Sequence, residues 1–218
     1  MIQPGHIRAA FDENAARYDR HAALEREACQ RLLNRVTFQR AEPDCVLDLG
    51  CGTGVGAEAL RTRFRKARVV ALDSAAAMLS EAGDRSRLMR RFGRVQGDLN
   101  ALPFPRHSAD LVFSNLALPW LAEPPRFLGE VLRVLRPGGM FLFSTYGPET
   151  LEQLHEAATA SSTGCEAPGF PDLLEIGDAL TATGFREPVM DVDRITLDYP
   201  SLAAMGRELE VTGTAMLV

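Results

Sequence analysis

Short apolar runs alternate with amphipathic stretches along the chain. Runs of β-branched and other apolar residues predict strands, and apolar residues that recur every three or four positions predict helices. The predicted strands are a run that starts at Cys45 and ends before Gly50, followed by 67–73, 94–98, 109–114, 140–146 and 188–199. The predicted helices are 5–36, two segments that start near Ala57 and at Ala75, and then 123–135, 172–183 and 201–209.

Strands that alternate with helices in this order predict an α/β fold. It is a doubly wound, Rossmann-like parallel sheet with right-handed crossovers. Ligands of such sheets bind at the carboxyl ends of the strands, beside the first strand. Polar residues occupy these predicted ends: Asp48, Asp73, Asp98, Ser114 and Asn115. Their common position predicts a single binding site.

The segment from Cys45 to Gly56 carries the strongest signal. Its apolar run contains Asp48 and is followed by glycines at positions 50, 52, 54 and 56. Such glycines permit a tight turn between strand and helix and let a ligand approach the main chain closely. A carboxylate just before the turn disfavours a bare phosphate and suits hydroxyl or ammonium groups. On the turn alone, the relaxed dinucleotide fingerprint Gly52-x-Gly54-x-x-Ala57 and a turn without any ligand remain open.

Acidic residues at the next two strand ends point to an adenosine ligand. Asp73 lies 25 positions after Asp48, where a carboxylate can accept both hydroxyls of a ribose. The alternative is that Asp73 only caps the next helix, for which Ser74 is the predicted N-cap. Asp98 can accept the exocyclic amine of an adenine, or can be an ordinary turn residue.

Taken together, the acidic strand ends match S-adenosylmethionine better than NAD. That ligand has an adenine, a ribose and an ammonium-bearing tail, but no phosphate. Its tail would lie on the turn Gly50-Cys51-Gly52, and its methyl group would point past Asn115 toward Trp120.

Composition narrows the possible partners. The length of 218 residues fits one domain, and the formal net charge of −5 argues against non-specific nucleic-acid binding. The four cysteines show no metal-ligand spacing, which predicts no metal site and free thiols in a reducing compartment. No stretch approaches the roughly 18 to 20 apolar residues of a membrane helix, and no secretory signal is visible. We therefore expect a cytoplasmic monomer without a membrane partner.

Several motifs resemble one enzyme family. The segment Val46-Leu47-Asp48-Leu49-Gly50-Cys51-Gly52-Thr53-Gly54 resembles the first motif of class I S-adenosylmethionine-dependent methyltransferases. Within that superfamily the chain is most similar to the malonyl-[acyl-carrier protein] O-methyltransferases of biotin synthesis. The segments that carry the similarity are 10–12 to 18–19, 98–99 with 102–104, 114–118 with Trp120, 133–139, 143–151, 170–172, 177–180, and 184–185 with 188–191. Pro119 departs from the family, which usually has a polar residue before the tryptophan.

The resemblance implies a division of the single domain. It places an N-terminal helical cap at 1–40 and a cofactor-binding core at 45–146. The stretch 157–169 consists of small and polar residues with proline and glycine, and this composition predicts a mobile connection. The C-terminal part at 170–218 is shorter than the family norm. Whether the family's closing antiparallel seventh strand is present stays open, because the last residues do not resemble it. Without that strand, an edge of the sheet would be unpaired.

The resemblance also implies an activity and a site. The activity is methyl transfer from S-adenosylmethionine to the free carboxylate of malonyl-acyl carrier protein, with malonyl-coenzyme A as a surrogate. No catalytic acid or base is assigned, because a carboxylate is already ionised at neutral pH. The implied cofactor-binding residues are Tyr18, Asp48, Gly50, Cys51, Gly52, Asp73, Ser74, Asp98, Leu99 and Asn115. The implied substrate-binding residues are Leu118, Trp120 and Tyr146.

Alternatives remain for both the residues and the function. Tyr18 and Trp120 are equally compatible with plain core packing. The arginines between positions 61 and 68 and between 85 and 94 either dock an acidic carrier protein or form solvated helix faces. A small-molecule methyltransferase of the same fold, a catalytically silent S-adenosylmethionine-binding protein and an NAD-dependent oxidoreductase are the competing functions.

Overall fold

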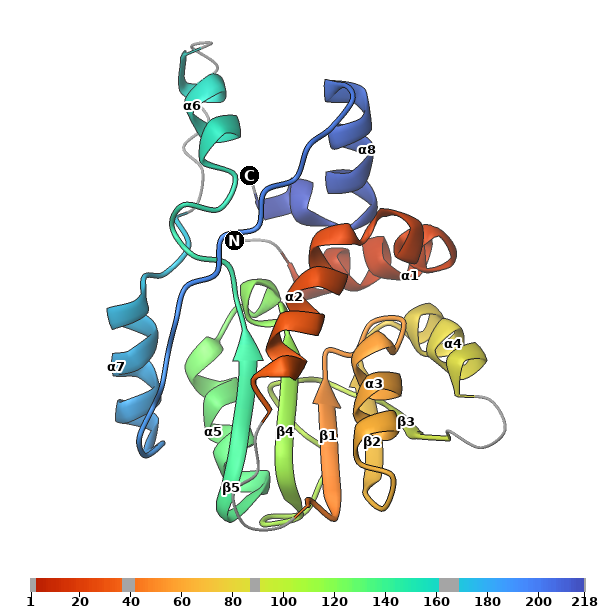
Figure 1. Cartoon of the computed structure of the whole chain (residues 1–218), viewed down its shortest axis with the longest axis vertical. Coiled ribbons are helices and arrows are strands. Elements are labelled where there is room, and N and C mark those ends of the chain that lie inside the picture. The colour runs from red at the N-terminus through yellow and green to blue at the C-terminus, as the bar shows by residue number, and fades with distance from the viewer. Residues whose placement is uncertain (1–2, 37–41, 87–90, 161–168, 218) are drawn as a thin grey trace.

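The computed structural model describes residues 3–36, 42–86, 91–160 and 169–217. Its centre is a sheet of five strands in the order β3-β2-β1-β4-β5, all of them parallel (Figure 1). The strands are β1 Cys45–Leu49, β2 Arg68–Asp73, β3 Gly93–Gln96, β4 Ala109–Asn115 and β5 Leu135–Ser144. The strand order reverses beside β1, which pairs with β2 on one side and β4 on the other. The predicted doubly wound parallel sheet is therefore confirmed.

Helices cover both faces of the sheet and its carboxyl-terminal edge. They are α1 Pro4–His21, α2 Ala23–Asn34, α3 Val55–Arg63, α4 Ala76–Arg85, α5 Pro124–Val134, α6 Glu152–Ala160, α7 Leu173–Thr183 and α8 Leu202–Val211, with short 3-10 helices η1 Leu118–Trp120 and η2 Thr214–Leu217. Alternate residues of β1 point to opposite faces: Val46 packs with α2, α3 and α4, and Leu47 packs with α5 and α7. The helices α1 and α8 lie above the carboxyl ends of the strands (Figure 1).

The predicted single helix over 5–36 is two helices. The chain turns at Ala22, whose φ of −90° and ψ of 52° are not helical, and whose side chain is buried. The two halves bury their apolar residues against different surfaces. Ala15 of α1 packs with Ala75 and Met78 beside α4, whereas Leu32 of α2 packs on the face of the sheet. One straight helix could not reach both surfaces.

The predicted strand over 188–199 is wrong. This segment is extended but forms no ladder with any described strand, and only some of its apolar residues, such as Met190, pack against the core. Val189 is 95% exposed and Val192 is 64% exposed. The alternation of β-branched and polar residues predicted a strand, but the structure holds the segment by side chains instead of by sheet hydrogen bonds.

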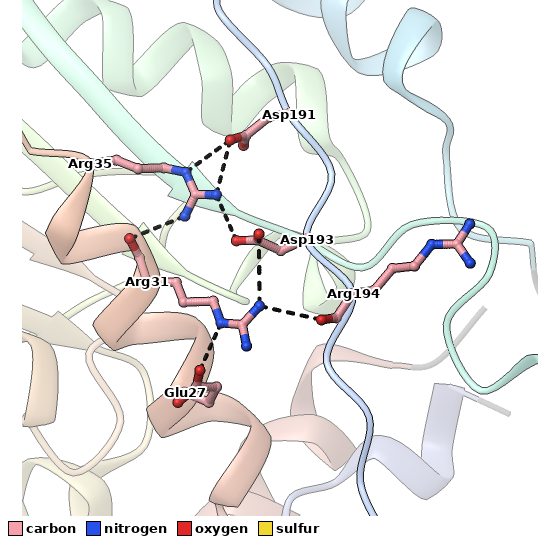
Figure 2. A network of polar contacts seen from close by, with 6 residues as sticks. All are labelled: Glu27, Arg31, Arg35, Asp191, Asp193 and Arg194. Atoms are coloured by element: carbon pink, nitrogen blue, oxygen red, sulfur yellow. Dashed lines mark hydrogen bonds and ion pairs between the residues drawn. The ribbon is translucent and has the colours of Figure 1, made fainter.

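Two arginines of α2 hold this extended segment (Figure 2). Arg35 Nε donates to Asp191 Oδ2 at 3.0 Å, and Arg35 NH2 donates to Asp193 Oδ2 at 2.7 Å. Arg31 lies 3.7 Å from the Asp193 carboxylate and donates to the carbonyl oxygen of Arg194 at 3.3 Å. We call these four side chains, Arg31, Arg35, Asp191 and Asp193, the α2 clasp. The clasp joins residues that are more than 150 positions apart in the sequence.

The prediction that Arg136-Pro137-Gly138-Gly139 stops the helix with a C-terminal glycine is wrong, because this segment lies inside a strand. The helix α5 ends at Val134, and β5 begins at once at Leu135. The register then shifts, because Ala109 pairs with Leu135 and Leu111 with Met140. Gly138, with φ of +79°, allows this bulge.

The predicted mobile connection over 157–169 is corrected at its start, where α6 extends to Ala160. Residues 161–168 of that connection lie outside the described residues. The last two predicted helices are confirmed. Asp172 caps α7 in a capping box with Glu175, and Ser201 caps α8 by accepting from the N–H of Ala204.

We predict that Arg35→Asp frees the segment over 188–199. Two attractive contacts of the clasp become repulsive, so limited proteolysis should cut this segment several times faster than in the wild type, as measured by mass spectrometry of the fragments. Global stability should fall by only about 1 kcal/mol, because exposed ion pairs contribute little. The paired exchange Arg35→Asp with Asp193→Arg should recover part of the resistance to cleavage. An unchanged cleavage rate in the single variant would show that the clasp does not hold the segment.

Candidate functional site

A cavity of about 580 Å³ opens at the carboxyl ends of β1 to β4, beneath α1 and α2. Every residue predicted to bind the cofactor lines it: Tyr18, Asp48, Gly50, Cys51, Gly52, Asp73, Ser74, Asp98, Leu99 and Asn115. Trp120 and Tyr146 also line it. Leu118 does not line the cavity, because its side chain packs with Phe127 and Leu128 of α5 in the core. The structure therefore brings together all the predicted residues except Leu118.

The glycine turn presents its main chain to this cavity. Gly50, Gly52 and Gly54 have φ of 71°, 52° and 83°, which favour glycine. A Cβ atom at Gly50 would lie 2.6 Å from the Cβ of Ala117, so no larger residue fits there. At Gly52, by contrast, no described atom lies within 4 Å of such a Cβ position. The turn is packed at Gly50 and open at Gly52, where a ligand can contact its backbone.

Asp48 contributes a buried carboxylate to this cavity. Its side chain is 2% exposed, and its Oδ2 atom has no hydrogen-bond partner in the described part of the chain. Gly56 allows α3 to start directly against it, because a Cβ there would lie 2.9 Å from Asp48 Oδ2. Burial raises the pKa of Asp48 to about 7. An ammonium group would satisfy this oxygen and favour its charged form, so the site fits the tail of S-adenosylmethionine.

Asp73 connects the glycine turn to the next helix. Its Oδ2 accepts from the N–H of Gly52 at 2.8 Å, and its Oδ1 accepts from the N–H of Ala75 at 2.9 Å. Burial raises the pKa of Asp73, and these N–H groups partly offset that rise. The N–H of Ser74 also interacts with this carboxylate, and the fourth of its acceptor positions would remain for a ribose hydroxyl. The prediction of Ser74 as N-cap is wrong, because α4 begins at Ala76 with Ala75 as its N-cap, whose side chain makes no capping hydrogen bond.

Asp98 and Asn115 are also engaged in local hydrogen bonds. Asp98 Oδ1 accepts from the N–H of Asn100 at 2.8 Å, which is the turn interaction weighed above, while the residue still lines the cavity. Asn115 Nδ2 donates to the carbonyl oxygen of Glu25 at 3.0 Å, and its Oδ1 accepts from Ser144 Oγ at 2.9 Å. Asn115 therefore ties α2, β4 and β5 together at the cavity wall.

The helix α1 closes the cavity from above. The Tyr18 side chain lies inside it, and burial, together with the nearby Glu25 carboxyl, raises its pKa well above the usual value. Phe11 contacts Trp120 edge to face, with ring centroids 5.1 Å apart. The N–H of Ala77 donates to Asp12 Oδ1 at 2.8 Å, which joins α1 to the start of α4. Tyr18 and Trp120 thus combine packing with exposure to the cavity.

Several lining residues had not been predicted. Thr53 Oγ1 donates to Asp19 Oδ1 at 2.6 Å, which ties the glycine turn to the end of α1, and Arg85 also pairs with Asp19. Thr53 follows Gly52 and Asp19 follows Tyr18, and this proximity to predicted residues is the only feature of the sequence that points to them. Glu25 and Arg26 of α2 line the cavity as well. Within the described residues, no three His, Cys, Asp or Glu side chains converge on a metal position.

The fold and the site define a class I methyltransferase, and comparison with known proteins agrees. The family described as a methyltransferase domain matches residues 47–143. Among solved structures, a complex of the Haloferax volcanii Trm112 methyltransferase activator with a methyltransferase matches with a TM-score of 0.68 and 26% identity, over 93% of this chain and 91% of that one. A methyltransferase from Thermotoga maritima matches in fold with a TM-score of 0.62, over 82% and 81% of the two chains, at 24% identity.

Curated relatives identify the family more narrowly. The malonyl-[acyl-carrier protein] O-methyltransferase of Laribacter hongkongensis is 44% identical over 95% of this chain and 72% of its own length. The protein of that name from Methylovorus sp. is 39% identical over 98% of this chain and 74% of its own length. The chain belongs to the family of malonyl-[acyl-carrier protein] O-methyltransferases.

We predict that Asp73→Ala weakens S-adenosylmethionine binding at least tenfold, which is roughly 1.4 kcal/mol. The variant loses both the proposed ribose acceptor and the bond that fixes Gly52. Isothermal titration calorimetry measures the affinity, and Asp178→Ala on the exposed side of α7 is the matched control. Unchanged affinity in a folded Asp73→Ala variant would remove the ribose assignment.

We also predict that Asp48 makes the stability of the ligand-free protein depend on pH. Its pKa is about 7 in the folded protein and about 4 in the unfolded chain. The folded state thus prefers the protonated form, and this contribution is fully present below about pH 4 and lost as the pH rises through about 7. Asp48→Asn should flatten the dependence of the melting temperature in that window. Parallel curves for the variant and the wild type would contradict the buried carboxyl as the cause.

Proposed function

We propose that the chain is an S-adenosylmethionine-dependent O-methyltransferase that converts the free carboxylate of malonyl-acyl carrier protein to its methyl ester. The observation that carries this proposal is the 44% identity to a malonyl-[acyl-carrier protein] O-methyltransferase over 95% of the chain. The cavity supports it, because unsatisfied and half-satisfied acidic groups surround an open glycine turn. This arrangement favours a cationic nucleoside over a dinucleotide phosphate.

The cofactor would lie along the carboxyl ends of the first three strands. Asp98 and Leu99 would hold the adenine, Asp73 and Ser74 the ribose, and the turn at Gly52 the amino-acid tail. When bound, S-adenosylmethionine supplies an electrophilic methyl group on a sulfonium. The unpartnered oxygen of Asp48 would compensate the positive charge of the tail.

The protein's contribution to the reaction is alignment and the exclusion of water. An ionised carboxylate attacks the methyl group directly, so no side chain has to remove a proton. An anion and a cation become two neutral products, and a site of low polarity favours this loss of charge. Tyr18 and Trp120 would provide this low polarity, because their aromatic side chains line the cavity. Holding the reacting atoms in line accounts for the rest of the acceleration.

The proposal includes a carrier-bound substrate, a cytoplasmic location and action as a monomer. Cys29, Cys45 and Cys51 are free thiols, which suits a reducing compartment. Among the described helices, none is both long and apolar enough to cross a membrane. Of the arginines proposed to dock an acidic carrier protein, Arg87 and Arg90 lie outside the described residues.

We predict that the purified chain transfers a tritiated methyl group from S-adenosylmethionine to malonyl-acyl carrier protein, as a base-labile ester. Malonyl-coenzyme A should serve as a weaker acceptor. Acetyl-acyl carrier protein is the matched control, because it offers the same carrier and thioester without a free carboxylate, and it should take up no label. Tight cofactor binding with no label on any malonyl thioester would instead indicate a silent binding protein.

A further inference from the structure

Glu25 places an unused carboxyl group inside the cavity. It lies in the first turn of α2, and its carbonyl oxygen is held by Asn115 Nδ2 at 3.0 Å. Its side-chain Oε2 atom is buried and has no hydrogen-bond partner in the part of the chain that the structure describes. A buried polar atom without a partner is costly, and in a binding cavity it is most simply explained by a ligand that satisfies it.

The surroundings of Glu25 place it on the acceptor side of the cavity. The groups that interact electrostatically with it are Glu208 of α8, Arg26 of α2, Tyr18 of α1, Tyr146 after β5 and Tyr199 before α8. Leu24 and Ala28, on the same helix as Glu25, pack in one cluster with Trp120 and Tyr146, which the resemblance assigns to the substrate. Glu25 therefore lies on the side of the cavity that carries the proposed substrate residues.

These neighbours favour the neutral form of Glu25 in the ligand-free protein. Burial, and secondarily the Glu208 carboxylate, raise its pKa to about 7, although the Glu25 N–H and Arg26 act in the opposite direction. Arg26 donates to the carbonyl oxygen of Asp19, and Glu208 accepts from the hydroxyl of Tyr199 at 2.8 Å. Near neutral pH this side chain can therefore carry a proton and donate a hydrogen bond.

We propose that the protonated carboxyl of Glu25 donates a hydrogen bond to the carboxylate of the malonyl group and positions it for methyl transfer. This inference rests on the function proposed above and adds a residue to the acceptor site. A carboxylic acid paired with a carboxylate forms a short, charge-assisted hydrogen bond. Two ionised carboxylates in the same place would repel each other. An ionised Glu25 would instead suit an amine acceptor, so its protonation state distinguishes the two acceptor classes.

The pH profile of catalysis follows from this assignment. The competent form is protonated, so kcat/KM for the malonyl thioester should fall as the pH rises through about 7. The malonyl carboxylate itself titrates at a much lower pH and stays ionised throughout. Glu25→Gln keeps a hydrogen-bond donor of the same shape at every pH.

The test compares pH profiles of kcat/KM on malonyl-acyl carrier protein for the wild type and Glu25→Gln. The variant should stay within about threefold of the wild type at pH 6 and lose most of the decline toward pH 9. Glu27→Gln is the matched control on the same helix, because the Glu27 side chain is 48% exposed, and it should retain the wild-type profile. Glu208→Gln should move the decline to lower pH, because it removes a negative charge near Glu25.

Two outcomes would overturn the inference while leaving the proposed function intact. A Glu25→Gln variant that is folded, binds S-adenosylmethionine normally and declines with pH like the wild type would place the titrating group elsewhere. A variant inactive at every pH, with unchanged cofactor affinity and melting temperature, would show that Glu25 acts as an anion. A wild-type chain that methylates no malonyl thioester would overturn both the function and the inference.

Discussion

The carboxylate of Asp73 is the contact on which the site depends. One of its oxygens fixes the glycine turn after β1, and the other fixes the start of α4 after β2. Thr53 of the same glycine turn donates to Asp19 at the end of α1. A short series of hydrogen bonds that begins at Asp73 therefore connects the glycine turn below the cavity with α1 above it. A group that fixes the protein in this way can also accept from a ligand, because each carboxylate oxygen has more than one lone pair.

The cavity contains two acidic side chains that the described residues do not fully satisfy. Asp48 and Glu25 each have a buried oxygen without a partner in the described chain. Burial makes both groups resist ionisation, which limits the cost of their desolvation. The ammonium group of the proposed cofactor would remove this penalty at Asp48. Binding and folding are therefore coupled through the same buried groups.

Much of the fold was predictable because local and tertiary preferences agree there. The run from Val46 to Gly54 combines a buried strand with a turn that only glycine can form, so its structure follows from its residues. Local and tertiary preferences disagree over 188–199. Apolar and polar residues alternate there as in a strand, but ion pairs with the arginine side chains at the end of α2 hold the segment instead of strand pairing. The two preferences also disagree at Ala22, where the helix break reflects two packing surfaces that no local pattern encodes. Glu25 was missed because a glutamate among the charged residues of an amphipathic helix resembles a solvated position.

The helix α2 joins two parts of the molecule that have different tasks. Its first turn carries Glu25 in the cavity wall, and its last turn and C-cap carry the arginines of the clasp (Figure 2). At 1.5 Å per residue, these ends are about 15 Å apart, and a helix of this length behaves as a stiff rod. The extended segment also reaches the first turn of α2, because Tyr199 at its other end interacts with Glu25 and donates to Glu208. The C-terminal segment therefore meets α2 at both ends of the helix, through the clasp at one end and beside the cavity at the other.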